Sequence, residues 1–175
     1  DYKNVVIDLN QTAHTISTQI RAFNFRDFQL PKVVGISISH CVIDKIKSTE
    51  KSGYILENNE WCLYCATVDY NIYLYKDRLI DLLKCCFEGN LELLKYFIRN
   101  KYSLNEQDDE GITPIIAACK NGQIEILKLL ALNGADFTLT DYSGKDPLSY
   151  ATSFDRNNNE CKKFILEKIA KGDVL

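Results

Sequence analysis

A long apolar run is missing from this sequence. A helix that crosses a membrane needs roughly 20 consecutive apolar residues, and no stretch of the 175 residues approaches that length. The opening residues, DYKNVVIDLN, also lack the basic and apolar regions of a signal peptide. We therefore expect no membrane partner and a cytoplasmic location. Methionine is absent too, and a start at Asp1 is what a processed product or the C-terminal segment of a longer protein would show.

An excess of positive charge is also missing. The 21 basic and 24 acidic residues are mixed along the chain and give a net charge of −3. Because nucleic acids are held by broad positive surfaces, we expect no nucleic-acid partner. Hydrophobic residues make up 46% of the chain, which is enough to bury the core of one domain or of two small ones.

Histidine is scarce, whereas cysteine is not. With only His14 and His40, a zinc site of the Cys/His kind would be short of ligands. The seven cysteines are an odd number and fall in apolar segments, so we interpret them as small hydrophobic residues of a reducing compartment. Cys62 and Cys65 look like a metal or redox pair, but on a strand this spacing points the two side chains to opposite faces. We predict no metal site.

A repeat organises the second half of the chain, with a step of 33 residues. Gly111-Ile-Thr-Pro114 recurs as Gly144-Lys-Asp-Pro147. In the other direction, Gly122-Gln-Ile-Glu125 falls on Gly89-Asn-Leu-Glu92. Because two different segments agree on one step, we predict an array of stacked structural units.

These residues resemble the ankyrin repeat, in which an Asp-x-x-Gly-x-Thr-Pro-Leu loop leads into two short helices that end at Asn-Gly-Ala-Asp. The best copy runs from Asp108 to Asp136. Thr113 is expected to cap a helix that Pro114 opens, and Gly122 to supply a left-handed turn between the helices. The resemblance implies about three stacked repeats, close to the minimum that can bury a shared core. It also implies binding of other proteins and no catalytic residue.

Both ends of the predicted array are atypical. The first unit, residues 78–100, lacks the Thr-Pro pair. The last unit begins at Asp141, but residues 152–159 make it about two residues longer than the repeat step, so we predict a capping repeat with an enlarged loop.

Residues 1–76 follow a different pattern. Residues 12–22 have apolar side chains on one helical face. Residues 33–43 and 54–75 are rich in β-branched and aromatic residues and are interrupted by turn residues, which predicts four or five short strands. The predicted fold is therefore α+β: a small β-barrel or sheet module with an entry helix, and then an all-α ankyrin-repeat array over residues 77–175.

A second resemblance covers residues 7–76. Four segments follow one another in the order found in the C-terminal module of formyltetrahydrofolate-dependent formyltransferases that act on nucleotide-linked amino sugars. They are the run from Ile20 to Pro31 (IRAFNFRDFQLP), Gly53–Ile55, Ala66–Asp69 and Ile72–Leu74. The resemblance implies a noncatalytic C-terminal region of a dTDP-amino-sugar N-formyltransferase that serves lipopolysaccharide O-antigen biosynthesis. Formyltetrahydrofolate would be bound by a catalytic domain outside this sequence.

That resemblance also implies partners. They are the catalytic domain, a second copy in a homodimer, and a dTDP-amino sugar bound in an accessory pocket. The alternative is a protein-interaction ankyrin module of the effector or host-range type, because ankyrin arrays usually bind proteins.

Eight residues are candidates for the nucleotide-sugar pocket. Trp61, the single tryptophan, follows a polar turn, where its ring can stack on a base. A diphosphate requires cations, and tyrosine hydroxyls suit a sugar. The predicted residues are Trp61, Tyr64, Lys76, Arg78, Tyr142, Lys145, Tyr150 and Arg156. The alternative for Trp61 is that it packs the β module against the first repeat.

Overall fold

The computed structural model describes residues 5–23, 30–153 and 159–170. The chain divides into two compact units, Asp1–Arg78 and Leu79–Leu175. The first contains a helix and a sheet, and the described part of the second contains helices and loops. The predicted α+β class is therefore confirmed.

The first unit is built on a five-stranded sheet whose neighbouring strands are all antiparallel. Across the sheet the strands lie in the order β1 (Lys32–Val33), β2 (Ile36–Lys47), β5 (Tyr70–Lys76), β4 (Cys62–Cys65) and β3 (Ile55–Asn58). Since β1 and β3 are the two edges of this order, the described strands form an open sheet and not a closed barrel.

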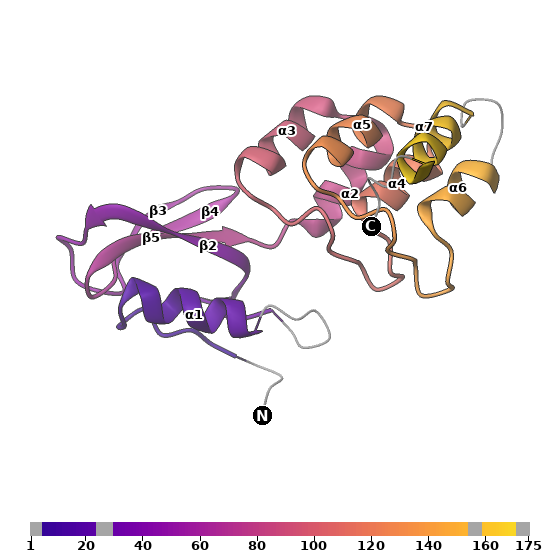
Figure 1. Cartoon of the computed structure of the whole chain (residues 1–175). Coiled ribbons are helices and arrows are strands. Elements are labelled where there is room, and N and C mark those ends of the chain that lie inside the picture. The colour runs from indigo at the N-terminus through magenta and orange to yellow at the C-terminus, as the bar shows by residue number, and fades with distance from the viewer. Residues whose placement is uncertain (1–4, 24–29, 154–158, 171–175) are drawn as a thin grey trace. The chain divides into compact units, whose positions relative to one another are not determined.

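Helix α1 (Ala13–Phe23) covers one face of the sheet (Figure 1). Ile16 and Ile20 recur at helical spacing and are buried in one cluster with Ile72 and Leu74 of β5. Each such side chain contributes about 1.5–3 kcal/mol when it leaves water. The predicted helix over residues 12–22 is thus confirmed to within one residue.

The start of α1 is fixed by a carboxylate from the sheet. Asp69 lies 56 residues further along the chain, and its Oδ1 accepts a hydrogen bond of 2.7 Å from the amide of Ala13. The same oxygen accepts bonds from the amide of Tyr70 and the hydroxyl of Thr67, at 2.8 and 3.0 Å. Burial alone would raise the pKa of Asp69, but these hydrogen bonds outweigh it and lower the pKa below its ordinary value.

The second unit consists of successive helix pairs. In chain order the helices are α2 (Leu79–Glu88), α3 (Leu91–Arg99), α4 (Pro114–Lys120), α5 (Ile124–Leu132), α6 (Pro147–Ser153) and α7 (Asn159–Ala170). The first helices of the pairs (α2, α4, α6) pack side by side in one layer, and the second helices (α3, α5, α7) form another (Figure 1).

The best-formed pair, α4 and α5, shows why this sequence makes short helices. The hydroxyl of Thr113 accepts the amide of Ile116 at 3.3 Å, and Pro114 opens α4. Gly122 has a φ of 63°, which lets the chain turn into α5. The predicted cap and the predicted left-handed turn are both confirmed.

The last described helix has a buried side and an exposed side of mixed character. Cys161 and Ile165 of α7 are buried, whereas Lys162, Lys163 and Glu167 are exposed. Leu166 and Ile169 are exposed as well, at 45% and 49%, so the outer side is only partly polar and the capping repeat stays a prediction. Most of the enlarged loop predicted before α7 lies outside the described residues.

The cysteines are core residues. Six of the seven are buried and Cys41 is half-buried, and all seven are free thiols. Within the described ranges, no cluster of three or more His, Cys, Asp or Glu residues is arranged to hold a metal ion. None of the helices in those ranges has the length and apolar character required to span a bilayer.

Candidate functional site

The predicted site residues divide between the two units. Trp61, Tyr64, Lys76 and Arg78 lie in the first unit, and Tyr142, Lys145 and Tyr150 lie in the second. Arg156 lies outside the described residues. The two groups are therefore two clusters, each with its own geometry.

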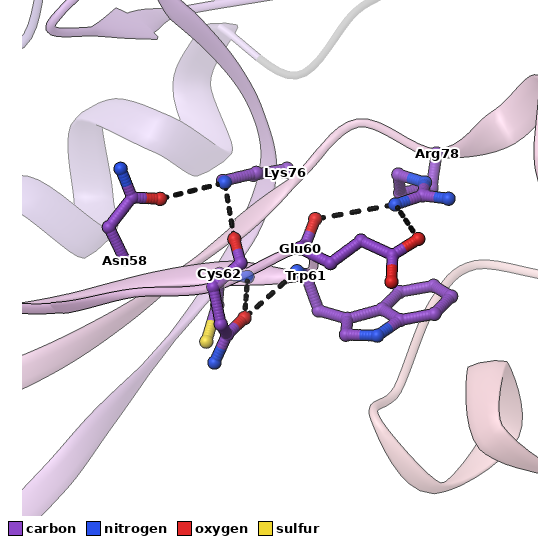
Figure 2. Close-up of polar contacts among 7 residues, drawn as sticks. Asn58, Glu60, Trp61, Cys62, Lys76 and Arg78 are labelled. Carbon is purple, nitrogen blue, oxygen red and sulfur yellow. Dashed lines mark hydrogen bonds and ion pairs between the residues drawn. The ribbon is translucent and has the colours of Figure 1, made fainter.

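The first cluster surrounds Trp61, in the turn between β3 and β4. The guanidinium of Arg78 lies over the Trp61 ring, 4.4 Å from its centroid (Figure 2). Its Nη1 also donates to the carboxylate of Glu60 at 3.1 Å and to the Glu60 carbonyl at 3.3 Å. Trp61 is half-buried, so its ring is neither a full core residue nor an open platform. A cation–π contact at such a site contributes about 0.5–1 kcal/mol.

The turn that presents Trp61 is held by hydrogen bonds on both sides. Asn59 Oδ1 accepts the amides of Trp61 and Cys62, both at 2.9 Å. Lys76 Nζ donates to Asn58 Oδ1 at 2.9 Å and to the carbonyl of Asn59 (Figure 2). Two predicted cations, Lys76 and Arg78, are thus near Trp61, and both already help to fix the turn.

Tyr64 belongs to a different set of contacts. Its hydroxyl donates to Asp44 Oδ2 at 2.6 Å and accepts from Asn71 Nδ2 at 3.0 Å, and its ring stacks on Tyr73 at 4.3 Å. Burial and the bond to the Asp44 carboxylate raise the pKa of Tyr64. The structure therefore uses Tyr64 to join neighbouring strands.

The second cluster centres on Tyr150 of α6. Its hydroxyl donates to Asp141 Oδ2 at 2.5 Å. Asp141 Oδ1 accepts the amide and hydroxyl of Ser143, at 2.9 and 2.8 Å, and the amide of Lys145 at 2.9 Å. The Tyr150 bond and the backbone bond from Lys145 hold the pKa of Asp141 far below its ordinary range, and the carboxylate raises the pKa of Tyr150 to about 12.

Two ammonium groups flank the Tyr150 ring. Nζ of Lys120 lies 5.2 Å from the ring centroid, and Nζ of Lys145 lies 5.9 Å from it. Lys120 ends α4 and Lys145 precedes α6, so the stacking of two repeats brings both ammonium groups near the Tyr150 ring.

The loops of two repeats are joined into one surface, which we name the loop ledge (residues 105–111 and 134–145). Gln107 Nε2 donates to the carbonyls of Gly111 and Thr140, at 2.9 and 2.7 Å. The amide of Tyr142 donates to the carbonyl of Glu110 at 3.1 Å. A Cβ on Gly111 would lie 2.5 Å from the Tyr142 amide nitrogen, so only glycine permits this approach. The Tyr142 side chain is 66% exposed.

Several of these residues were missed by the sequence reasoning. Asp141 could have been found, because it is the first residue of the repeat pattern, where a side-chain oxygen can close a turn. Glu60, Gln107 and Lys120 carry no signal in the sequence, since their roles come from neighbours far along the chain.

Stacked helix pairs joined by ordered loops define a solenoid repeat protein. A family model described as ankyrin repeats, with three copies, matches residues 82–174, which is more than half of the chain. The chain therefore belongs to the ankyrin-repeat family, and the prediction of about three repeats is confirmed.

Three individual relatives match part of the chain, and one of them is itself named as an ankyrin repeat protein. An ankyrin repeat protein of Rickettsia bellii (strain RML369-C) is 29% identical over 104 residues, which is 54% of this chain and 61% of the relative. Human transient receptor potential cation channel subfamily A member 1 is 37% identical over 46% of this chain and 7% of the channel. Human protein phosphatase 1 regulatory subunit 27 is 30% identical over 42% of this chain and 48% of that protein. The chain thus spans less than two thirds of the length of each.

These findings overturn the formyltransferase interpretation. The matched family and the Rickettsia relative are described by ankyrin repeats, and none of the four descriptions given above names a formyltransferase. The segments behind that resemblance do not recur along the chain: one is a run of twelve residues, and the other three have three or four residues each. The formyltetrahydrofolate cofactor, the absent catalytic domain and the O-antigen pathway were inferred only through it, and they have no independent basis in the structure.

Proposed function

We propose that this chain is a protein-recognition module and that the loop ledge is its binding surface. Ankyrin arrays typically bind proteins, and one relative is named as a regulatory subunit of a phosphatase. Both facts favour the protein-interaction alternative.

The rigid presentation of Tyr142 carries the proposal. Gln107, Gly111 and Glu110 bind the two loops to each other, so the backbone under Tyr142 is fixed before any partner arrives. A large exposed ring on a fixed backbone loses little conformational freedom on binding, which is why tyrosine is favoured in binding surfaces.

Selection from a library of random linear peptides displayed on phage tests the proposal. We expect enriched peptides whose binding to the purified chain is lost with Tyr142→Ala. Tyr54→Ala is the matched control, because Tyr54 is similarly exposed, at 59%, but lies in the first unit. Absence of enrichment, or peptides that bind the Tyr142 variant normally, would refute the ledge as the binding surface.

A nucleotide-sugar site at Trp61 is the second candidate, favoured by one observation. The planar guanidinium of Arg78 already lies over one face of the Trp61 ring, and Lys76 is hydrogen-bonded to the adjoining turn. A base such as thymine would stack on the ring for about 1–3 kcal/mol, and the two cations would face a diphosphate.

Calorimetric titration with dTDP tests this candidate, with Trp61 fluorescence as an independent signal from the single tryptophan. We expect heat and a fluorescence change in the native chain and no heat with Trp61→Ala. If dTDP gives neither signal, the candidate fails.

The homodimer stays a prediction. Sedimentation velocity of the purified chain would measure its oligomeric state.

A further inference from the structure

The lysines beside Tyr150 are positioned for an anion. Among the ion pairs found in the described residues, none includes Lys120 or Lys145. The Tyr150 ring lies within 6 Å of both ammonium groups, at 5.2 and 5.9 Å. Cation–π attraction favours this arrangement. The contact with the ring restricts both lysine side chains, which lowers the conformational cost of binding an anion beside Tyr150.

Two nearby carboxylates, those of Asp141 and Asp146, already accept hydrogen bonds. Both oxygens of Asp141 accept hydrogen bonds from Tyr150 and from the loop, and Oδ1 of Asp146 accepts the amide and hydroxyl of Ser149 at 2.7 and 2.5 Å. Both carboxylates serve as turn and helix caps. An incoming carboxylate would thus be the group that makes direct charge-assisted hydrogen bonds to Lys120 and Lys145.

The loop ledge also carries negative charge, opposite in sign to that of the two lysines. Asp109 and Glu110 are exposed at the tip of the first loop, and the carbonyl of Glu110 is bonded to the amide of Tyr142. Complementary charges determine how a partner aligns on the surface, because an acidic group is repelled by Asp109 and Glu110 and a basic group is repelled by the two lysines. The negative charge of Glu110 also contributes to the raised pKa of Tyr150, so this acidic tip lies near the ring that Lys120 and Lys145 flank. Together, the loop ledge and Lys120 carry negative charge at the tip, an aromatic ring at Tyr142 and positive charge at the two lysines.

We infer that the ledge recognises a bipolar protein segment, with an acidic side chain that enters between Lys120 and Lys145 and a basic side chain that meets Asp109 and Glu110. The inference rests on the proposed function, since it names the partner of the same surface. It specifies two charges of opposite sign in the bound segment.

Peptide selections with charge-altered baits test the inference. We expect peptides selected on the native chain to contain an Asp or Glu at one position and a Lys or Arg at another. Lys120→Glu/Lys145→Glu should weaken the best synthetic peptide by at least about tenfold, and replacing the acidic residue of that peptide by lysine should restore binding to this variant. Asp109→Lys/Glu110→Lys should behave in the same way toward the basic position.

Lys162→Glu/Lys163→Glu on the outer side of α7 is the matched control, because it makes the same change of net charge elsewhere in the array. Far-UV circular dichroism of each variant checks that the repeats are folded, and Lys120→Gln/Lys145→Gln provides a milder replacement.

Peptides that need Tyr142 but show no charge preference, or that bind the charge-altered baits unchanged, would overturn the inference and leave the proposed function standing. If no peptide depends on Tyr142, the proposed function fails and the inference fails with it.

Discussion

The hydrogen bond between Tyr150 and Asp141 couples the array to pH. The carboxylate raises the pKa of Tyr150 to about 12, whereas tyrosine in an unfolded chain ionises near about pH 10. The folded state therefore holds this proton more tightly than the unfolded state. The resulting stabilisation is complete below about pH 10 and is lost as the pH rises toward about 12.

Denaturant unfolding at about pH 9 and about pH 11.5, followed by far-UV circular dichroism, measures this loss. Tyr150→Phe cannot make the bond, so we expect its free energy of unfolding to fall less between the two pH values than that of the native chain. Tyr54→Phe, a change at an exposed tyrosine, should keep the native dependence. An identical pH dependence in the native chain and Tyr150→Phe would show that the bond does not contribute.

Single-residue roles were predictable only where they are local. Thr113 and Gly122 act on neighbours within a few residues, so the repeat pattern alone identified the cap and the turn. The bond from Tyr150 to Asp141 and the stacking of Arg78 on Trp61 depend on how the chain folds back, and no sequence periodicity encodes them. Trp61 was singled out from the sequence as a ligand-stacking ring, which stays a prediction, and in the structure the guanidinium of Arg78 lies over this ring and helps to hold the turn.

At the level of elements, Asp69 links α1 to the sheet. Because a carboxylate at a helix N-terminus satisfies free amides, we expect Asp69→Asn to lower the free energy of unfolding of the first unit by about 1 kcal/mol. Trp61 fluorescence during urea unfolding would measure this.

The pKa of Asp69 is lowered in the folded state, so the stabilisation is present above about pH 4 and is lost as the pH falls below it. Glu50→Gln, at an exposed site, is the control, and equal acid sensitivity of the native chain and the Asp69 variant would contradict the prediction.

The loops of successive repeats allow a matched comparison of two glycines. Gly111 and Gly144 occupy the same repeat position and have φ values of 81° and 84°. A Cβ at Gly111 would lie 2.5 Å from the Tyr142 nitrogen, whereas a Cβ at Gly144 would have no described atom within 4 Å. Both alanine variants share the backbone strain, so Gly111→Ala should cost about 1–3 kcal/mol more than Gly144→Ala. Thermal unfolding of the two variants measures the difference, and equal losses would mean that the loops can separate at little cost.

Element boundaries show where sequence patterns fail. The helix predicted over residues 12–22 is Ala13–Phe23 in the structure, because apolar spacing determines a helical face directly. The strand predicted over residues 33–43 is instead two strands, broken where Val34 adopts a φ of 50°. Valine strongly favours extended backbone, so its pattern gave no sign of this turn.

For the whole molecule, the repeat was the reliable signal and the short motifs were not. A step that recurs across about a hundred residues constrains the architecture of every helix within it. One twelve-residue run (Ile20–Pro31) and three segments of three or four residues in residues 7–76 constrain only local structure, and they led to the formyltransferase interpretation that the family and its relatives overturn. The same reasoning explains why the α+β class was predictable and the choice between sheet and barrel was not, since strand order depends on pairings between distant segments.

Thiol reactivity offers a measurement across both units. Six cysteines are buried and Cys41 is half-buried. Burial raises the pKa of Cys41 and also those of Cys65 and Cys161, the last two to about 11. Since the thiolate is the reactive form, all of these thiols should react slowly at about pH 8. Because only Cys41 is partly accessible, a disulfide reagent should modify it first and the other six only as their cores open. Cys41→Ser should remove the fast phase, and denaturant should expose all seven thiols of the native chain. Fast modification of several thiols in the folded protein, or a fast phase that survives Cys41→Ser, would mean that at least one of the two cores opens far more readily than its packing implies.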